Sequence, residues 1–190
     1  GNTVMDFDPE EISKKMSLGL SVGYAHHNDC KINVIDVPGS PDFIGETIVS
    51  IPAVENVVLV VNGTAGYEVG LELAIEQLEN EKAAKIVLVN RMDNEHADFQ
   101  TTLDTIYENA GFNPIPVHIP IGKESTFEGV VDVIRQKAIL PGGEKDIPAD
   151  MQSTVAEAHQ KLMEAIAETD EELLNDFLEK GELSEEQLIN

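Results

Sequence analysis

The chain has 190 residues and a formal net charge of -24, from 36 acidic and 12 basic side chains. A charge this negative argues against a direct grip on nucleic-acid phosphates and favours a basic protein partner. The single cysteine, Cys30, excludes an internal disulfide and fits a reducing, cytoplasmic location. No apolar run approaches the ~20 residues that a membrane helix needs, so we expect no membrane partner.

Three apolar runs are predicted to be strands, at residues 31–36, 56–62 and 84–90. Their near-continuous aliphatic character is typical of parallel strands that helices cover on both faces. The first run ends at Pro38 and Gly39, which indicates a turn directly after a short buried strand. Between the second and third runs, residues 70–83 carry apolar side chains at helical spacing, so the unit is strand, helix, strand.

The alternation of strand and helix continues to about residue 121 and is then replaced by a different pattern. A helix is expected over residues 97–111, closed by Gly111, followed by a strand within 113–121 that its prolines shorten. Residues 129–134 and 136–141 favour an antiparallel pair, followed by a Gly-rich loop. Three helices are expected after this loop, one with Pro148 at its first position, one closed by Gly181 and one with Ser184 as its N-cap.

Polar residues follow the first predicted strand, at the edge where open α/β sheets bind ligands. They read Asp36, Val37, Pro38 and Gly39. The aspartate could hold a metal ion through water, while the glycine amide faces a terminal phosphate without an obstructing side chain. The alternative is a type II turn without a ligand.

After the third predicted strand come Asn90, Arg91, Met92 and Asp93, which resemble the Asn-Lys-x-Asp element of guanine-nucleotide proteins. In that element the aspartate accepts hydrogen bonds from the guanine ring, and the basic side chain packs on the base. Arg91 replaces the lysine here, and a guanidinium stacks well on a flat ring, although the two residues are not interchangeable. The alternative is that Asp93 or Asn94 caps the following helix.

A longer likeness includes both motifs. The segments that carry it are "DPEEISKKMS", "DVPGSPDFIGE", "VVNGTAGYEVGLE", "VNRMDNEHADFQTTL" and "IPIGKESTFEGVVDVIRQKAI". They resemble, over essentially the whole chain, the GTP-binding domain of the translation elongation factor G family. The resemblance implies an α/β fold of the P-loop NTPase type, with a parallel sheet truncated at its N-terminus and an α+β insert. It assigns residues 1–30 to a switch I remnant, 31–122 to a partial GTPase core and 123–190 to the inserted subdomain.

The resemblance also implies a ribosome-associated translational GTPase that binds GTP or GDP with Mg²⁺ and hydrolyses GTP during translocation. Mg²⁺ would be held by Asp36 through water and by Ser17, the counterpart of a threonine in switch I. Acidic residues 150–172 match the part of the insert that meets the ribosomal stalk protein. The implied GTP-binding residues are Asp36, Val37, Pro38, Gly39 and Ser40 at the γ-phosphate, and Asn90, Arg91, Met92 and Asp93 at guanine.

Two departures from the family pattern affect these expectations. Ser40 stands where the family usually has the histidine that orients the attacking water. The phosphate-binding loop G-x-x-x-x-G-K-[ST] is not in the printed sequence, because in "PIGKES" Val117 stands at the first glycine position and Glu124 follows Lys123. We therefore expect a piece of a longer protein that by itself is inactive and hardly binds nucleotide.

Several alternatives stay open. The chain could be a nucleotide-silent module that docks on the ribosomal stalk, or part of a ribosome-protection or peptide-release GTPase. A role in ribosome recycling is an alternative to the role in translocation. A truncated sheet also exposes an edge that could pair with a second copy. His26, His27, Asp29 and Cys30 suggest a metal site, but their spacing matches no standard ligand set, and a surface turn is favoured.

Overall fold

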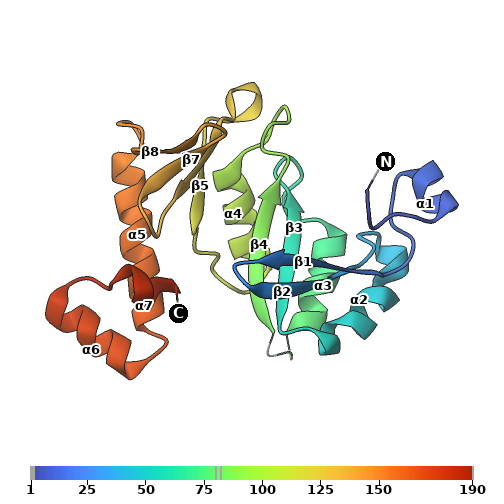
Figure 1. Ribbon diagram of the computed structural model, residues 1–190, viewed down its shortest axis with the longest axis horizontal. Helices are drawn as coiled ribbons and strands as arrows, with labels where there is room; N and C mark the ends of the chain where they lie inside the picture. Colours follow the sequence, from blue (N-terminus) through green and yellow to red (C-terminus); the bar gives the residue numbers. More distant parts are fainter. Residues whose placement is uncertain (1–2, 80, 82, 190) are drawn as a thin grey trace. The chain divides into compact units, whose positions relative to one another are not determined.

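The computed structural model describes residues 3–79, 81 and 83–189 (Figure 1). The chain divides into two compact units. One unit contains Gly1–Val61 and Tyr67–Leu88, and the other contains Asn62–Gly66 and Val89–Asn190. Within the described ranges, no helix is long and apolar enough to cross a membrane.

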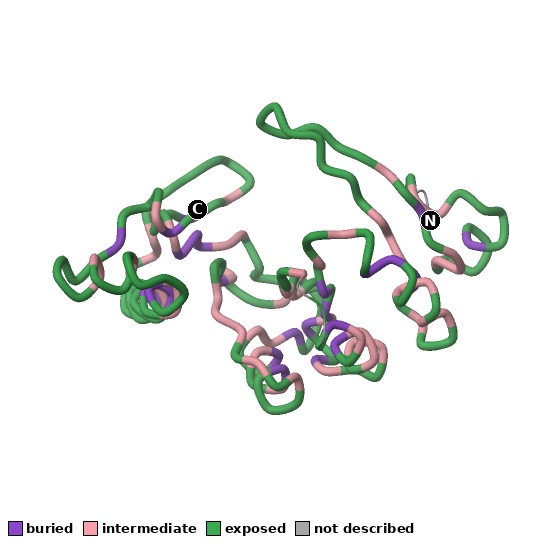
Figure 2. The backbone as a smooth tube through the Cα atoms, turned by 90° about the horizontal axis from the view of Figure 1, so that it is seen from below, coloured by how far each residue is buried: buried purple, intermediate pink, exposed green. Residues whose placement is uncertain are grey.

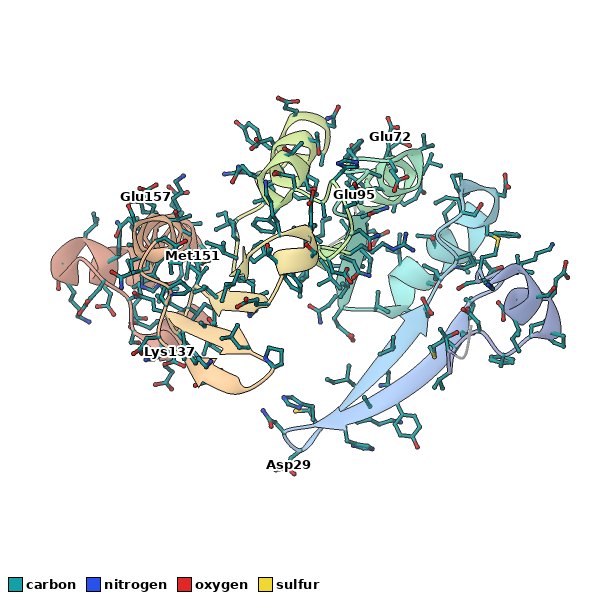
Figure 3. All side chains as sticks on the ribbon, turned by 90° about the horizontal axis from the view of Figure 1, so that it is seen from above. Asp29, Glu72, Glu95, Lys137, Met151 and Glu157 are labelled. Carbon is teal, nitrogen blue, oxygen red and sulfur yellow. The ribbon has the colours of Figure 1, made fainter. Side chains whose placement is uncertain are left out.

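The first unit begins with a short helix and a hairpin. Helix α1 (Pro9–Lys14) starts with a capping box, in which Asp8 accepts the N–H of Glu10 and Glu11 accepts the N–H of Asp8. Strands β1 (Ser21–His27) and β2 (Cys30–Asp36) then pair antiparallel. Two residues with positive φ, Asn28 and Asp29, form the turn between them, and Figure 3 labels Asp29 at the tip of the hairpin.

The first predicted strand exists as β2, but the prediction of a buried parallel strand is wrong. Among the described strands β2 pairs only with β1, and Figure 2 colours most of the hairpin as exposed. Ile32 and Val34 are 47% and 45% exposed. A two-stranded ribbon without a covering layer cannot bury both of its faces, so apolar character alone did not decide burial.

The turn expected at His26 and His27 also lies elsewhere. Both histidines belong to the last part of β1, and the chain reverses at the two residues after them. The strand was missed because glycine, alanine and histidine interrupt the β-branched pattern that predicts strands.

A second missed element follows the first unit's hairpin. The 3-10 turn η1 (Pro41–Phe43) leads into helix α2 (Ile44–Ser50), and the 3-10 turn η2 (Ile51–Ala53) follows. Isoleucine, threonine and valine make up much of α2, and these β-branched residues lower helix propensity. Sequence periodicity therefore gave no sign of this helix.

Strands β3 (Asn56–Asn62) and β4 (Ala84–Asn90) confirm the second and third predicted strands. The N–H of Ala84 donates to the carbonyl of Glu55 at 3.0 Å, and the N–H of Gly63 donates to the carbonyl of Asn90 at 2.9 Å. Because these bonds join start to start and end to end, the strands are parallel (Figure 1). Helix α3 (Val69–Leu78) lies between them in the chain and ends before the predicted residue 83.

Within the described residues, only one face of this strand pair is covered. Leu59 and Val61 are buried, whereas Val58 and Val60 between and beside them are 54% and 61% exposed. In β4, Ile86 and Leu88 are exposed as well. The prediction of helices on both faces is therefore wrong for this part of the chain, and the alternation is that of a sheet with one open face.

The second unit contains α4 (Phe99–Asn109), and Gly111 follows it with the positive φ expected after a helix end. An antiparallel sheet comes next, in the order β5-β6-β7-β8. The predicted pair of strands in this region is confirmed, and the Gly-rich loop expected after it contains a short further strand. The bounds are β5 (His118–Ile121), β6 (Gly129–Asp132), β7 (Lys137–Leu140) and β8 (Gly143–Lys145).

Three helices complete this unit: α5 (Gln152–Ala167), α6 (Glu171–Lys180) and α7 (Glu185–Ile189). Helix α5 packs on the sheet through Val155 and Leu162, which share a core with Ile119, Val131 and Val133. A second cluster joins α5 to α7 and contains Met163, Ala167, Leu183 and Leu188.

The ends of these helices test three predictions. Gly181 follows α6 with a φ of 77°, as expected. Ser184 accepts the N–H of Gln187 through its hydroxyl oxygen at 3.3 Å, as an N-cap does. Pro148, however, is not at the first position of α5, because its carbonyl accepts the N–H of Met151 in a turn before the helix.

Candidate functional site

The loop of residues 36–40 (the 36–40 loop) belongs to the first unit and joins β2 to η1. Gly39 does not have the positive φ that a type II turn with Pro38 before it requires, so that alternative is excluded. Pro38 is buried and Gly39 is exposed. Ser40 precedes η1, and its side chain makes no capping hydrogen bond there, so the hydroxyl is not committed to the turn.

The 36–40 loop lies close to the backbone of helix α3. The carbonyl oxygen of Gly39 lies 2.9 Å from the place where a Cβ on Gly70 would be. Gly70 is the second residue of α3, and α3 contacts η1. Any side chain at this position would displace the backbone of the 36–40 loop, so this close approach requires glycine at position 70. Sequence reasoning missed Gly70, although a glycine inside a helix is a signal of close approach.

The carboxylate of Asp36 lies in a negative environment. Partial burial raises the pKa of Asp36, and the charges of Asp6 and Glu11 raise this pKa further. The hydroxyl of Ser17 donates to Asp6 Oδ1 at 2.8 Å, and this hydrogen bond lowers the pKa of Asp6. The gathering of negative charge favours a cation near Asp36. Sequence reasoning missed Asp6, which is hydrogen-bonded to Ser17 and acts on Asp36 through its charge.

The chemistry of these residues fits Mg²⁺. Asp36, Asp6 and Ser17 offer only oxygen donors, which are the ligands that this hard cation prefers. Across the described residues, no group of three or more His, Cys, Asp or Glu side chains could hold a metal ion. Mg²⁺ commonly binds through one or two protein oxygens together with waters and substrate phosphates, and the oxygen donors of these residues are compatible with that mode of binding.

The loop of residues 90–96 (the 90–96 loop) belongs to the second unit and follows β4. The side-chain oxygen of Asn90 accepts the N–H of Arg91 at 2.8 Å, and Arg91 has a φ of 60°. This left-handed turn precedes Met92, which is buried, while Asp93 is exposed. The sulfur of Met92 lies 2.9 Å from the place where a Cβ on Gly63 would be, so this glycine makes room for Met92.

The structure excludes the alternative that Asp93 or Asn94 caps the next helix. Asp98 is the N-cap of α4, and its Oδ1 accepts the N–H of Thr101 at 2.8 Å. Asp93 and Asn94 lie too early in the chain for this role. Figure 3 labels Glu95 in the same loop. The exposed carboxylate of Asp93 therefore has no part in the cap of α4.

Two further segments of the second unit hold the 90–96 loop. Gly63 donates its N–H to the Asn90 carbonyl at 2.9 Å and accepts the N–H of Asp98 at 3.0 Å. Glu124 donates its N–H to the Met92 carbonyl at 2.9 Å, and its Oε1 accepts the N–H of His96 at 2.9 Å. Sequence reasoning examined Glu124 only as part of a failed phosphate loop and missed this contact.

The chain is similar to proteins of known families. A family model described as the elongation factor Tu GTP binding domain matches residues 1–182. Elongation factor G from Thermotoga maritima is 34% identical and that from Thermotoga sp. (strain RQ2) 33% identical, each over 99% of this chain. The chain spans 28% of the length of each.

A solved structure points the same way. A crystal structure of a protein from Thermus thermophilus matches with a TM-score of 0.87 at 28% identity, covering 99% of this chain and 29% of that one. The resemblance to elongation factor G and the α/β fold of translational GTPases are thereby confirmed. The chain belongs to the elongation factor Tu GTP-binding domain family.

Proposed function

We propose that this chain is the central part of the GTP-binding domain of a ribosome-associated translational GTPase of the elongation factor G kind. In the complete protein it binds GTP or GDP together with Mg²⁺ and hydrolyses GTP in the translocation step of elongation. The observation that carries the proposal is the 90–96 loop, which follows a parallel strand and exposes Asp93 without using it to cap α4.

The two loops have separate tasks in this proposal. Asp93 accepts the hydrogen bonds that the guanine ring donates, while Arg91 stacks on the base. Asp36 holds Mg²⁺ through water, and the Gly39 amide faces the γ-phosphate. Bound Mg²⁺ supplies positive charge against the phosphate oxygens. The hydroxyl of Ser40 holds the attacking water beside the γ-phosphate.

Replacing Asp93 by Asn tests the proposed guanine recognition. In the full-length factor, Asp93→Asn is expected to weaken GDP binding on the order of 10- to 100-fold, because a hydrogen-bonded charge is lost. The same variant should gain affinity for xanthosine diphosphate, whose ring presents an acceptor where guanine has an amino donor. Titration with fluorescent analogues of both nucleotides measures the two affinities.

Glu95→Gln is the matched control, because it removes one carboxylate from the same loop at an exposed position. This control should bind GDP as the unchanged factor does. An unchanged factor that binds no guanine nucleotide would favour the nucleotide-silent module. An Asp93→Asn variant that keeps its preference for GDP would sink the assignment of Asp93.

The acidic helices add a partner to the proposal. Helix α5 buries Val155, Leu162 and Met163 and exposes Glu157 and Glu164 (Figure 3 labels Glu157). Apolar residues hold the helix in place, and the two outer carboxylates are exposed, each accepting one hydrogen bond from a side chain one turn earlier in the same helix. This pattern supports docking of the ribosomal stalk protein on α5.

A further inference from the structure

We propose that Glu124 is a positioning residue for guanine recognition, holding the 90–96 loop in the conformation that presents Asp93. This role depends on the proposed function of that loop. Glu124 makes no contact with Asp93 in this role and acts through the backbone of residues 92 and 96, which lie on either side of it. It comes from a separate segment, 28 residues beyond His96 in the chain.

The two bonds of Glu124 lie on either side of Asp93. The N–H of Glu124 donates to the carbonyl of Met92, directly before Asp93, at 2.9 Å. The carboxylate of Glu124 accepts the N–H of His96, three positions after Asp93, at 2.9 Å. His96 has a φ of 69°, in the left-handed region that few non-glycine residues adopt, and the bond to Glu124 helps to hold this conformation. One residue therefore ties both ends of the segment that carries Asp93.

The turn that presents Glu124 is itself tightly held. Gly122 has a φ of 75°, and a Cβ on it would collide with the carbonyl of Thr126. The Thr126 hydroxyl accepts the N–H of Lys123 at 3.1 Å and donates to the Lys123 carbonyl at 2.7 Å. The carbonyl of Glu124 accepts the N–H of Phe127 at 3.1 Å. A preorganised turn of this kind transmits its position to the loop that it binds.

Removing the carboxylate should therefore affect affinity more than chemistry. In the full-length factor, Glu124→Ala is expected to raise the dissociation constant and the dissociation rate of GDP about 5- to 10-fold, the scale of one ordinary hydrogen bond at an exposed position. KM for GTP should rise by a similar factor. The ribosome-stimulated kcat should stay within about twofold, because the bond orients the base-binding loop and not the phosphates.

Two variants accompany this measurement. Glu124→Gln keeps an oxygen that can accept the His96 N–H and should restore affinity to within about twofold of the unchanged factor. Glu128→Ala removes an exposed carboxylate from the same region and should leave affinity unchanged. Stopped-flow release of a fluorescent GDP analogue gives the dissociation rates, and circular dichroism checks that each variant is folded.

The outcomes separate the two proposals. An unchanged factor without GDP affinity overturns the proposed function itself. If that factor binds GDP and Glu124→Ala releases it equally slowly, or if Glu128→Ala releases it as fast as Glu124→Ala does, the role of Glu124 is wrong. Should Glu124→Ala fail to fold, hydrogen exchange of the His96 amide in the unchanged factor decides, and exchange at the rate of an unprotected peptide contradicts the contact.

Discussion

Two glycines, Gly45 and Gly70, occupy the same place in different helices but have different surroundings. Each is the second residue of its helix, α2 or α3. A Cβ on Gly45 would meet nothing within 4 Å, whereas one on Gly70 would lie 2.9 Å from the Gly39 carbonyl. The first glycine is replaceable, and the second is required by the loop that carries the proposed phosphate contacts.

This contrast predicts opposite effects on stability. Gly45→Ala should raise the free energy of unfolding by about 0.5 to 1 kcal/mol, because alanine restricts the unfolded chain and favours the helix. Gly70→Ala should lower it by about 1 kcal/mol or more, because backbone has to move. Urea unfolding followed by circular dichroism compares the two variants. Equal stabilisation by both would mean that the Gly39 carbonyl is not confined by α3.

The N-cap of α4 predicts that the stability of the fold depends on pH. Hydrogen bonding from the Thr101 amide lowers the pKa of Asp98 below its ordinary value of 3.8. The folded chain thus favours the ionised form of Asp98. The contribution of this ionised cap to the free energy of unfolding is fully present above pH 3.8 and is lost as the pH falls through the lowered pKa.

Asp98→Ala should accordingly lower the free energy of unfolding by about 1 kcal/mol at pH 7. The difference from the unchanged chain should shrink as the pH falls below 3.8, because protonation removes the cap from the unchanged chain as well. Asp98→Asn, which also caps well, should cost much less. Urea titrations across this range measure the difference, and a gap that stays constant with pH would contradict an ionised cap.

Strands β3 and β4 show which features of the fold could be predicted from the sequence. β3 and β4 were predicted to the residue, because aliphatic runs between turn residues leave few alternatives. The covered and open faces of this pair could not be predicted, since burial depends on which other elements lie nearby. The residues of both loops follow from motif and resemblance. The contact of Glu124 with His96 joins segments that no periodicity connects, so only the fold reveals it.

The net charge of -24 attracts basic proteins to the whole surface of the molecule, whether or not they dock at one particular face. A docking face must then be distinguished from general attraction of a basic protein. Two helices allow this comparison, since α5 exposes Glu157 and Glu164 and α3 exposes Glu72 and Glu76.

The double variant Glu157→Lys/Glu164→Lys should weaken binding of the purified ribosomal stalk protein on the order of 10-fold if α5 is the docking face. Glu72→Lys/Glu76→Lys changes the net charge of the molecule equally and should alter this affinity less than about twofold, within the range of general screening. Isothermal titration of the full-length factor measures both. Equal losses in the two variants would reduce the interaction to net charge, and no loss in either would remove α5 from it.

The hairpin of β1 and β2 has a consequence for the order of folding. Its strands are adjacent in the chain, and its turn residues already have the φ values that a right-twisted ribbon needs. Such a ribbon closes within about 1 to 10 μs. The parallel partners β3 and β4 must first bring together segments that a helix and two loops separate, which costs more loop-closure entropy. We expect the hairpin to form early and the sheet beside the 90–96 loop to be completed later.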